Sequence, residues 1–234
     1  MGIILFNGIS SEEYGIQVEH PPGYNYAERD YTVVHIPGRN GDLIQDNGSF
    51  KNRTRSYPIA LLTPNDSFVE SANKIATWLC SPSGYSRLED SYEPDYFNLA
   101  YYSEKNLVEN ILQGAGRTTI QFICKPQRFL KSGERTIILE NADAIFNPTS
   151  FKAKPLLKIY GGTGNVTIGS ITFTLTGIST YIMVDCEMQD AYKENQNENS
   201  KMTGQFPVLN AGLNSISWTG SITKIEIMPR WWII

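Results

Sequence analysis

The residue types that carry most enzyme and metal chemistry are scarce in this sequence and widely spaced. Histidine occurs only at His20 and His35, and cysteine only at Cys80, Cys124 and Cys186. A zinc site, or a nucleophile with an imidazole base, needs several such side chains to converge on one point. There is no CxxC pair and no GxSxG elbow. We therefore predict no catalytic residue, no metal ligands and no cofactor, and we expect the cysteines to be three buried thiols.

One cluster of carboxylates has a spacing that could serve acid–base chemistry. Its members are Glu89, Asp90, Glu93 and Asp95. A glycosidase holds two carboxylates about 5 to 10 Å apart on either side of a sugar. The serine, tyrosine and proline among these four residues instead favour a hydrated loop that leads into a strand from Tyr96 to Tyr102. A wall-degrading hydrolase is therefore the less favoured interpretation.

Composition limits the classes of partner. Twenty Lys and Arg against 24 Asp and Glu give a net charge of −4, so the chain lacks the basic footprint of a nucleic-acid-binding protein. The longest early apolar run is Ile3–Phe6, followed soon by Glu12 and Glu13, which predicts neither a signal peptide nor membrane insertion. Hydrophobic residues make up 41% and charged residues 19%, a balance that predicts a folded chain made in the cytoplasm.

The pattern of the chain predicts a mainly β protein, of the β-rich α+β class. Short segments rich in Thr, Tyr, Ile and Val are separated about every ten residues by Gly, Pro, Asn and Asp. In residues 171–176, apolar residues alternate strictly with threonine, as in a strand with one solvent-exposed face. One helix is predicted from Ser67, where a capping box with Glu70 precedes apolar residues at helical spacing, and Pro82 ends it.

A change in composition near residue 145 predicts two domains. Residues 1–145 carry 13 basic and 18 acidic side chains, whereas residues 146–234 carry 7 and 6. Asn147-Pro148 offers a break in regular structure between them. The 89 residues that follow residue 145, with about seven short β segments, have the size of a small β-sandwich.

Two features are candidates for contact with other molecules. Asn40-Gly41 and Asn47-Gly48 are tight-turn signals on either side of a short strand over 42–46, so we predict an exposed hairpin over 38–50. Trp218 could stack on a sugar ring, although packing in the core is the commoner role of a tryptophan in a strand.

Several short motifs follow one another in a recognisable order along nearly the whole chain. They are Phe6-Asn7-Gly8, Ile36-Pro37-Gly38-Arg39-Asn40-Gly41-Asp42-Leu43, Ile75-Ala76-Thr77-Trp78-Leu79, Pro94-Asp95-Tyr96-Phe97, Cys124-Lys125-Pro126, Gly164-Asn165-Val166-Thr167-Ile168-Gly169 and Gly204-Gln205-Phe206-Pro207. This order resembles that of the distal tail proteins (Dit) of long non-contractile-tailed phages.

The resemblance implies an N-terminal β-sandwich-type belt domain with one helix over 1–145, which forms a ring, and a galectin-like β-sandwich over 146–234. It implies a non-enzymatic homohexamer in the virion, at the tail tip or baseplate. Its implied partners are the tail-tube protein, the tail-associated hub or lysin protein and receptor-binding proteins used in host attachment. DNA would pass through the central channel without sequence-specific binding.

A closed ring requires two different complementary patches on each subunit, and an exposed hairpin is a ready means of contact. The candidate contact residues in the hairpin are Arg39, Asn40, Asp42, Gln45 and Asp46. The alternative function is a carbohydrate-binding, lectin-like module that recognises the host surface, with Trp218 as its stacking residue. Residues 146–234 contain no histidine and one arginine, Arg230, which disfavours a galectin-type sugar site.

Overall fold

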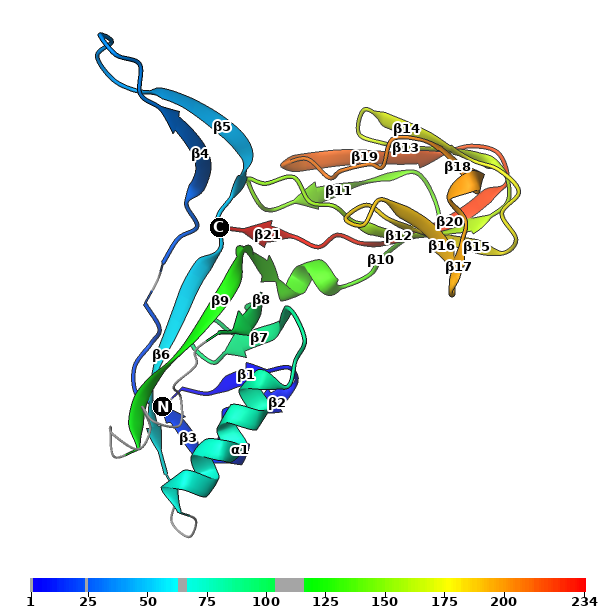
Figure 1. The fold of residues 1–234 in the computed structure, drawn as a ribbon. Helices are drawn as coiled ribbons and strands as arrows, with labels where there is room; N and C mark the ends of the chain where they lie inside the picture. Colours follow the sequence, from blue (N-terminus) through cyan, green and yellow to red (C-terminus); the bar gives the residue numbers. More distant parts are fainter. Residues whose placement is uncertain (1, 24, 63–66, 104–115) are drawn as a thin grey trace. The chain divides into compact units, whose positions relative to one another are not determined.

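The computed structural model describes residues 2–23, 25–62, 67–103 and 116–234, as Figure 1 shows. The chain forms two compact units, Met1–Arg128 together with Ile234, and Phe129–Ile233. Antiparallel sheets make up most of the described residues, and α1 (Phe68–Cys80) is the one α-helix among them. The predicted β-rich α+β class is confirmed. None of the described helices has the length and apolar character needed to cross a membrane.

The second unit begins before residue 145. β10 (Ile137–Leu139) pairs with β20 (Ile222–Met228), and β11 (Asp143–Asn147) pairs with β19 (Gly212–Trp218). Both early strands are therefore held by ladder hydrogen bonds to strands near the C-terminus. Residue 145 lies inside β11, so the change in composition there does not coincide with the border between the compact units.

One curled sheet forms the first unit. In spatial order its strands are β2 (Ile9–Ser10), β1 (Ile4–Phe6), β7 (Ser86–Asp90), β8 (Tyr96–Tyr102), β9 (Arg117–Leu130), β6 (Arg53–Leu61) and β3 (Ile16–Val18). A bridge between Gly2 and Val18, with two N–O distances of 3.3 Å, joins the chain before β1 to β3 at the far edge. The short 3-10 helix η1 (Ser11–Tyr14) connects β2 to β3.

Helix α1 covers one face of this sheet (Figure 1). The Ser67 side chain accepts a hydrogen bond from the Glu70 backbone N–H, which satisfies one of the free donors at the start of the helix. Ile75 and Leu79 are buried against the sheet, and each contributes about 1.5–3 kcal/mol by leaving water. The Trp78 indole N–H donates to a backbone oxygen of β1 at 3.2 Å, which fixes the helix to the strand.

A separate two-stranded sheet is formed by β4 (Arg29–Val34) and β5 (Leu43–Phe50), so a hairpin does include residues 38–50. The second predicted turn is wrong, because Asn47-Gly48 lies inside β5. The register shifts there, and Gly48 adopts a φ of +76° in a bulge. The Gly48 N–H donates to the Asp46 carboxylate at 2.8 Å, which stabilises the bulge.

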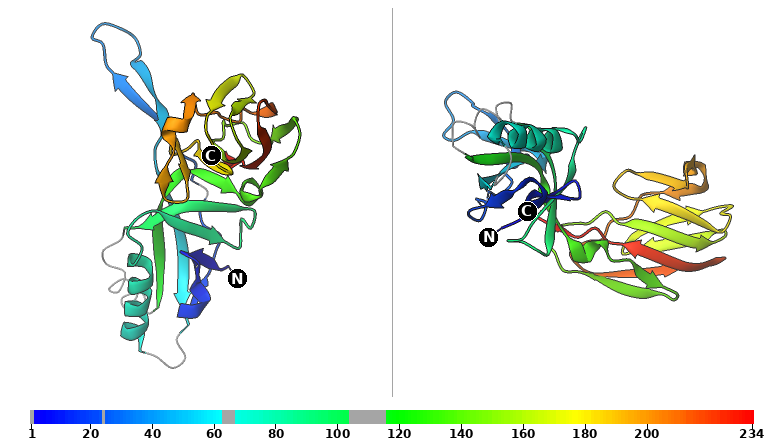
Figure 2. Two further views of the ribbon diagram at one scale, coloured as in Figure 1. Left: turned by 90° about the vertical axis from the view of Figure 1, so that its right-hand side faces the viewer. Right: turned by 90° about the horizontal axis from the view of Figure 1, so that it is seen from below.

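The second unit has two facing sheets, whose layers can be followed in Figure 2. The first runs in the order β10, β20, β12 (Leu156–Gly161), β15 (Tyr181–Asp185), β16 (Asp190–Lys193) and β17 (Gln196–Asn197). The other runs in the order β11, β19, β13 (Gly164–Ile168), β14 (Ile171–Leu175) and β18 (Met202–Gly204). Their alternating inward residues form one core, which includes Leu157, Ile159, Val166, Phe173, Ile216 and Ile225.

Hydrogen bonds fix the last residues of the second unit to other parts of that unit. The two terminal guanidinium nitrogens of Arg230 each donate to the Asp185 carboxylate at 2.8 Å. The same carboxylate accepts from the backbone N–H groups of the turn after β15. The Leu130 N–H donates to the Trp231 carbonyl at 2.9 Å, which joins the end of β9 to the segment before β21 (Trp232–Ile233). The remaining 3-10 helices are η2 (Lys131–Glu134) and η3 (Asn199–Lys201).

Candidate interaction surfaces

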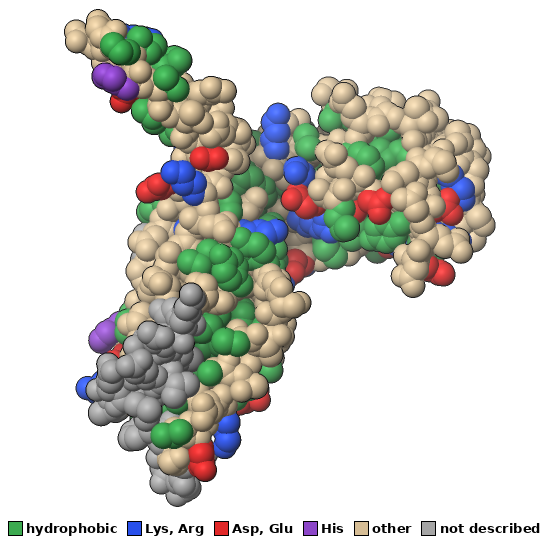
Figure 3. Space-filling view, viewed as in Figure 1, with side chains coloured by type: hydrophobic (Ala, Val, Ile, Leu, Met, Phe, Trp, Pro, Cys, Tyr) green, Lys and Arg blue, Asp and Glu red, His purple; other side chains and the backbone are tan. Residues whose placement is uncertain are grey.

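The β4–β5 hairpin carries side chains on two exposed faces. Its register places Val33 opposite Ile44 on one face and Val34 opposite Leu43 on the other. Val33 is 59% exposed and Ile44 is 62% exposed, and Figure 3 shows hydrophobic side chains gathered on this hairpin. Apolar side chains in a two-stranded sheet have no core of their own to enter. This hairpin therefore offers an apolar surface to another molecule.

Polar groups on the hairpin bind mainly to one another. The Arg29 guanidinium pairs with the Asp46 carboxylate at 3.0 Å, and the His35 ring pairs with the Asp42 carboxylate at 3.0 Å. The Thr32 hydroxyl donates to the Asn47 side chain at 3.1 Å. These exposed contacts add little stability individually, but they hold the two strands in register.

The five predicted contact residues do not form a single surface. Arg39 and Asn40 lie in the turn between the strands, where the Arg39 N–H donates to the Ile36 carbonyl at 3.2 Å. Gln45 lies opposite Thr32, whereas Asp46 lies opposite Tyr31 on the other face. Asp42 and Asp46 already have partners within the hairpin.

Sequence reasoning missed the exposed apolar residues of this hairpin. They are Tyr31, Val33, Val34, Ile36, Leu43 and Ile44. The signal was available in the strand-forming run over 31–36, which combines high β-propensity with few charges. Its exposure was not visible in the sequence, because the same pattern is typical of a buried strand.

Two of the four clustered carboxylates are buried in ion pairs, so the predicted hydrated loop is wrong for them. Asp90 accepts hydrogen bonds from the Arg55 guanidinium and the Tyr57 hydroxyl, both at 2.7 Å. Glu93 pairs with Arg55 at 2.5 Å and also with Arg128. The cationic partners come from β6 and β9, which the tertiary fold places in the same sheet as β7, on the far side of β8. These two carboxylates neutralise buried arginines and are not directed into a substrate cleft.

Burial and the neighbouring charges together set the protonation of this cluster. Burial by itself lowers the pKa of Arg55, but Tyr57, Asp90 and Glu93 outweigh it and raise that pKa above its ordinary value. Burial raises the pKa of the Tyr57 hydroxyl, so this group stays protonated and donates to Asp90. Burial lowers the pKa of Arg53. The cluster therefore stabilises the sheet through fixed charges and hydrogen bonds.

The three cysteines are free thiols, but they are not all buried. Cys80 is exposed at the end of α1, whereas Cys124 and Cys186 are buried. Burial raises the pKa of Cys124 to about 11 and that of Cys186 to about 12, which keeps both protonated at neutral pH. Across the described ranges, no three His, Cys, Asp or Glu side chains gather in a way that could hold a metal ion.

Trp218 lies at the end of β19, opposite the buried Val166 in the ladder. Residues opposite each other in a ladder point to the same side of the sheet, so this indole packs partly buried against the sandwich core. Part of the Trp218 side chain, the sugar-stacking candidate of the alternative function, is therefore used in packing.

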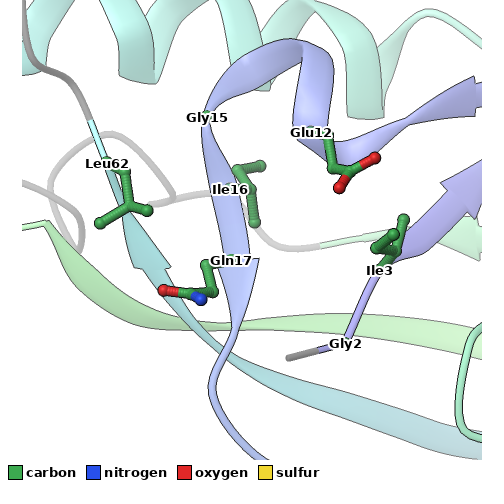
Figure 4. Close-up of a pocket in the computed structure, with 7 residues that line it drawn as sticks. All are labelled: Gly2, Ile3, Glu12, Gly15, Ile16, Gln17 and Leu62. Atoms are coloured by element: carbon green, nitrogen blue, oxygen red, sulfur yellow. The ribbon is translucent and has the colours of Figure 1, made fainter.

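A depression of about 290 Å³ in the first unit is shown in Figure 4. Its lining consists of Gly2, Ile3, Glu12, Gly15, Ile16, Gln17 and Leu62. Among the described residues of this lining, Glu12 is the one ionisable side chain. Acid–base catalysis or metal binding would need further groups beside it.

Comparison with known proteins identifies the fold. No family model matches the sequence, and no curated protein is significantly similar to it. Among solved structures, the chain resembles SPP1 Dit (gp 19.1), described as a paradigm of the hub adsorption apparatus in phages that infect Gram-positive bacteria. The TM-score is 0.77 at 11% sequence identity, and the match covers 100% of both chains. This chain therefore has the fold of SPP1 Dit along its whole length.

Proposed function

We propose that this protein is a structural subunit of a phage tail tip, a distal tail protein that acts as a hub. The observation that carries the proposal is the match to SPP1 Dit, which extends over both units of the chain. A similar arrangement of one β-rich unit followed by a second is more specific than a match to either unit alone. A fold does not by itself determine function, so the assembly requires a direct test.

The proposed assembly is a homohexameric ring, formed by the first unit as a belt. A ring closes through a heterologous contact, in which one patch of each subunit binds a different patch of the next. The β4–β5 hairpin supplies one such patch, because Val33 and Ile44 are exposed on a strand pair that joins no other described strand. The turn residues Arg39 and Asn40 add polar groups at the tip of the hairpin, and Gln45 adds one on the opposite face.

Within the virion, the ring would join the tail-tube protein on one side to the tail-associated hub or lysin protein on the other. The galectin-like second unit would carry receptor-binding proteins at the periphery for host attachment. DNA would pass through the central channel without being bound, and a net charge of −4 per chain repels it. The subunit would be made in the host cytoplasm and then incorporated at the tail tip.

Light scattering with negative-stain imaging tests the assembly. Six chains of 26.3 kDa give a particle of about 158 kDa, and we expect a six-fold ring with a central hole. A stable trimer would be consistent with a half assembly. A chain that stays monomeric at high concentration would contradict the proposal.

We propose no enzymatic activity, because Asp90 and Glu93 are used in buried ion pairs. Incubation with purified host cell wall should release no sugar or peptide, and sustained turnover would contradict this part of the proposal. The lectin-like alternative is tested by glycan binding. Binding that is lost in Trp218→Ala while the fold is retained would favour the alternative.

A further inference from the structure

The outer face of the six-stranded sheet in the second unit carries a cluster of lysines and tyrosines. On β12, Lys158 and Tyr160 alternate with the buried Leu157 and Ile159, so the lysine and the tyrosine point away from the core. Tyr160 lies opposite Tyr181 on β15. We call the set Lys158, Tyr160, Tyr181, Lys193, Lys224 and Glu226 the lysine–tyrosine face.

Its ammonium groups lie over the two tyrosine rings. The Lys158 ammonium is 4.5 Å from the Tyr181 ring centre and 5.2 Å from that of Tyr160. Lys193 lies 5.1 Å from the Tyr181 ring centre, and Lys224 lies 4.1 Å from that of Tyr160. Each ring thus has two cations within the range of a cation–π interaction. Because Lys158 shares a ring with each of the others, its ammonium is at most 9.6 Å from Lys193 and 9.3 Å from Lys224.

The positive charge on this face is only partly neutralised. Lys224 pairs with Glu226 at 2.7 Å. Lys193 donates to the Ser179 carbonyl and to the Thr180 hydroxyl, which fixes its position without removing its charge. Among the described residues, no carboxylate lies within ion-pair distance of Lys158 or Lys193. Counted over its six members, the face keeps two positive charges in excess, and Glu140 is a further carboxylate that interacts with Lys224. Residues 129–233 as a whole carry nine basic and nine acidic side chains.

We propose that the lysine–tyrosine face binds an anionic polymer of phosphodiester-linked sugars or polyols. Converging ammonium groups match the charges of phosphates, because lysine acts as a point charge. The planar arginine fork suits bidentate binding of a single carboxylate or phosphate group, and this face contains no arginine. Its separate lysines instead suit single charges spaced along a polymer. The lysines over Tyr160 and Tyr181 also oppose base stacking, on which single-stranded nucleic-acid binding depends.

A repeating polymer also suits a repeated site. This step rests on the proposed ring, in which each subunit would present one copy of the face. Two or three lysines give weak binding per subunit, and a polymer that engages several subunits gains affinity through effective concentration. The inference therefore deepens the proposed attachment role by giving the second unit a ligand of defined chemistry.

Binding of poly(glycerol phosphate) by the full chain, measured calorimetrically at about 50 mM salt, tests the proposal. We expect saturable binding that weakens about tenfold or more in Lys158→Gln/Lys224→Gln. The slope of log affinity against log salt should fall by about 0.7 for each lysine removed, as for a flexible single strand. Lys152→Gln/Lys154→Gln is the matched control, because it removes the same charge from the same unit outside the face, and it should bind like the wild type.

Four results would overturn the proposal: no binding by the wild type, equal losses in both double variants, equal or tighter binding of poly-L-glutamate, or equal binding of single-stranded DNA. Light scattering on the same samples separates this inference from the proposed function. A ring that assembles but does not bind the polymer refutes only the inference. A chain that binds the polymer through these lysines but stays monomeric refutes only the proposed function as a tail-tip hub.

Discussion

Val33 and Ile44 lie directly opposite each other in the β4–β5 ladder, and each is more than half exposed. A cross-strand apolar pair of this kind stabilises a hairpin only modestly. Buried against a second molecule, each side chain would contribute about 1–2 kcal/mol. The pair is therefore better suited to association than to the stability of the single chain.

Replacing both residues should impair assembly without unfolding the chain. In Val33→Ser/Ile44→Ser we expect each subunit contact to lose about 2 kcal/mol, or roughly thirtyfold in affinity. Light scattering should then report smaller particles than the wild type at equal concentration. Phe146→Ser/Leu213→Ser removes another exposed cross-strand pair, on the second unit, and serves as the control. Normal assembly of the hairpin variant would exclude this apolar pair as a subunit contact.

Asp90→Ala should destabilise the first unit strongly. The substitution leaves Arg55 with a buried charge that is only partly compensated, and the loss should be about 3–5 kcal/mol in urea unfolding. Glu28→Ala removes the partner of Lys51 in an exposed pair and should change stability by less than about 1 kcal/mol. Similar losses of unfolding free energy in the two variants would show that the buried ion pair stabilises the chain no more than an exposed one.

The Asp185–Arg230 pair should make the second unit sensitive to acid. Burial alone would raise the pKa of Asp185, but the hydrogen bonds from Arg230 and from the Met188 N–H lower this pKa overall below its ordinary value. A carboxylate with a lowered pKa in the folded state stabilises fully above its unfolded pKa, and this contribution is lost as the pH falls through the folded value.

We therefore expect Asp185→Asn to lose about 2–3 kcal/mol at pH 7, because hydrogen bonds to a charged group are weakened. Its stability should also fall less steeply than that of the wild type below about pH 4. Denaturant unfolding over a series of pH values gives both quantities. If the unfolding free energies of the wild type and of Asp185→Asn changed in parallel with pH, this would contradict a lowered pKa of Asp185 in the folded state.

Thiol labelling should distinguish the three cysteines. At pH 8 we expect a disulfide reagent to modify Cys80 in the native chain, because that thiol is exposed. Cys124 and Cys186 should react only after unfolding, since burial blocks access and raises their pKa values to about 11 and 12. Cys80→Ser should leave no rapidly reacting thiol. Fast labelling of that variant would show that one of the buried sites opens readily.

The sequence by itself determined the local elements with strong signals. Helix α1 begins beside Ser67 and ends before Pro82, because capping and apolar spacing act within a few residues. The strict alternation in 171–176 gave β14 for the same reason. The motif order also predicted the Dit fold that the comparison supports.

Only the tertiary structure decided where charges and apolar groups became buried or exposed. Asp90 and Glu93 resembled a solvated loop until β6 and β9 placed arginines beside them. The run over 31–36 resembled a core strand, but it lies in a hairpin that has no sheet to cover it. The lysine–tyrosine face arises from β12, the β15–β16 hairpin and β20, three segments that are far apart in sequence. Whether a side chain is buried or exposed depends on which distant strands pair with its own strand. A local sequence pattern predicts that a strand forms, but it does not identify the strands that will pair with it.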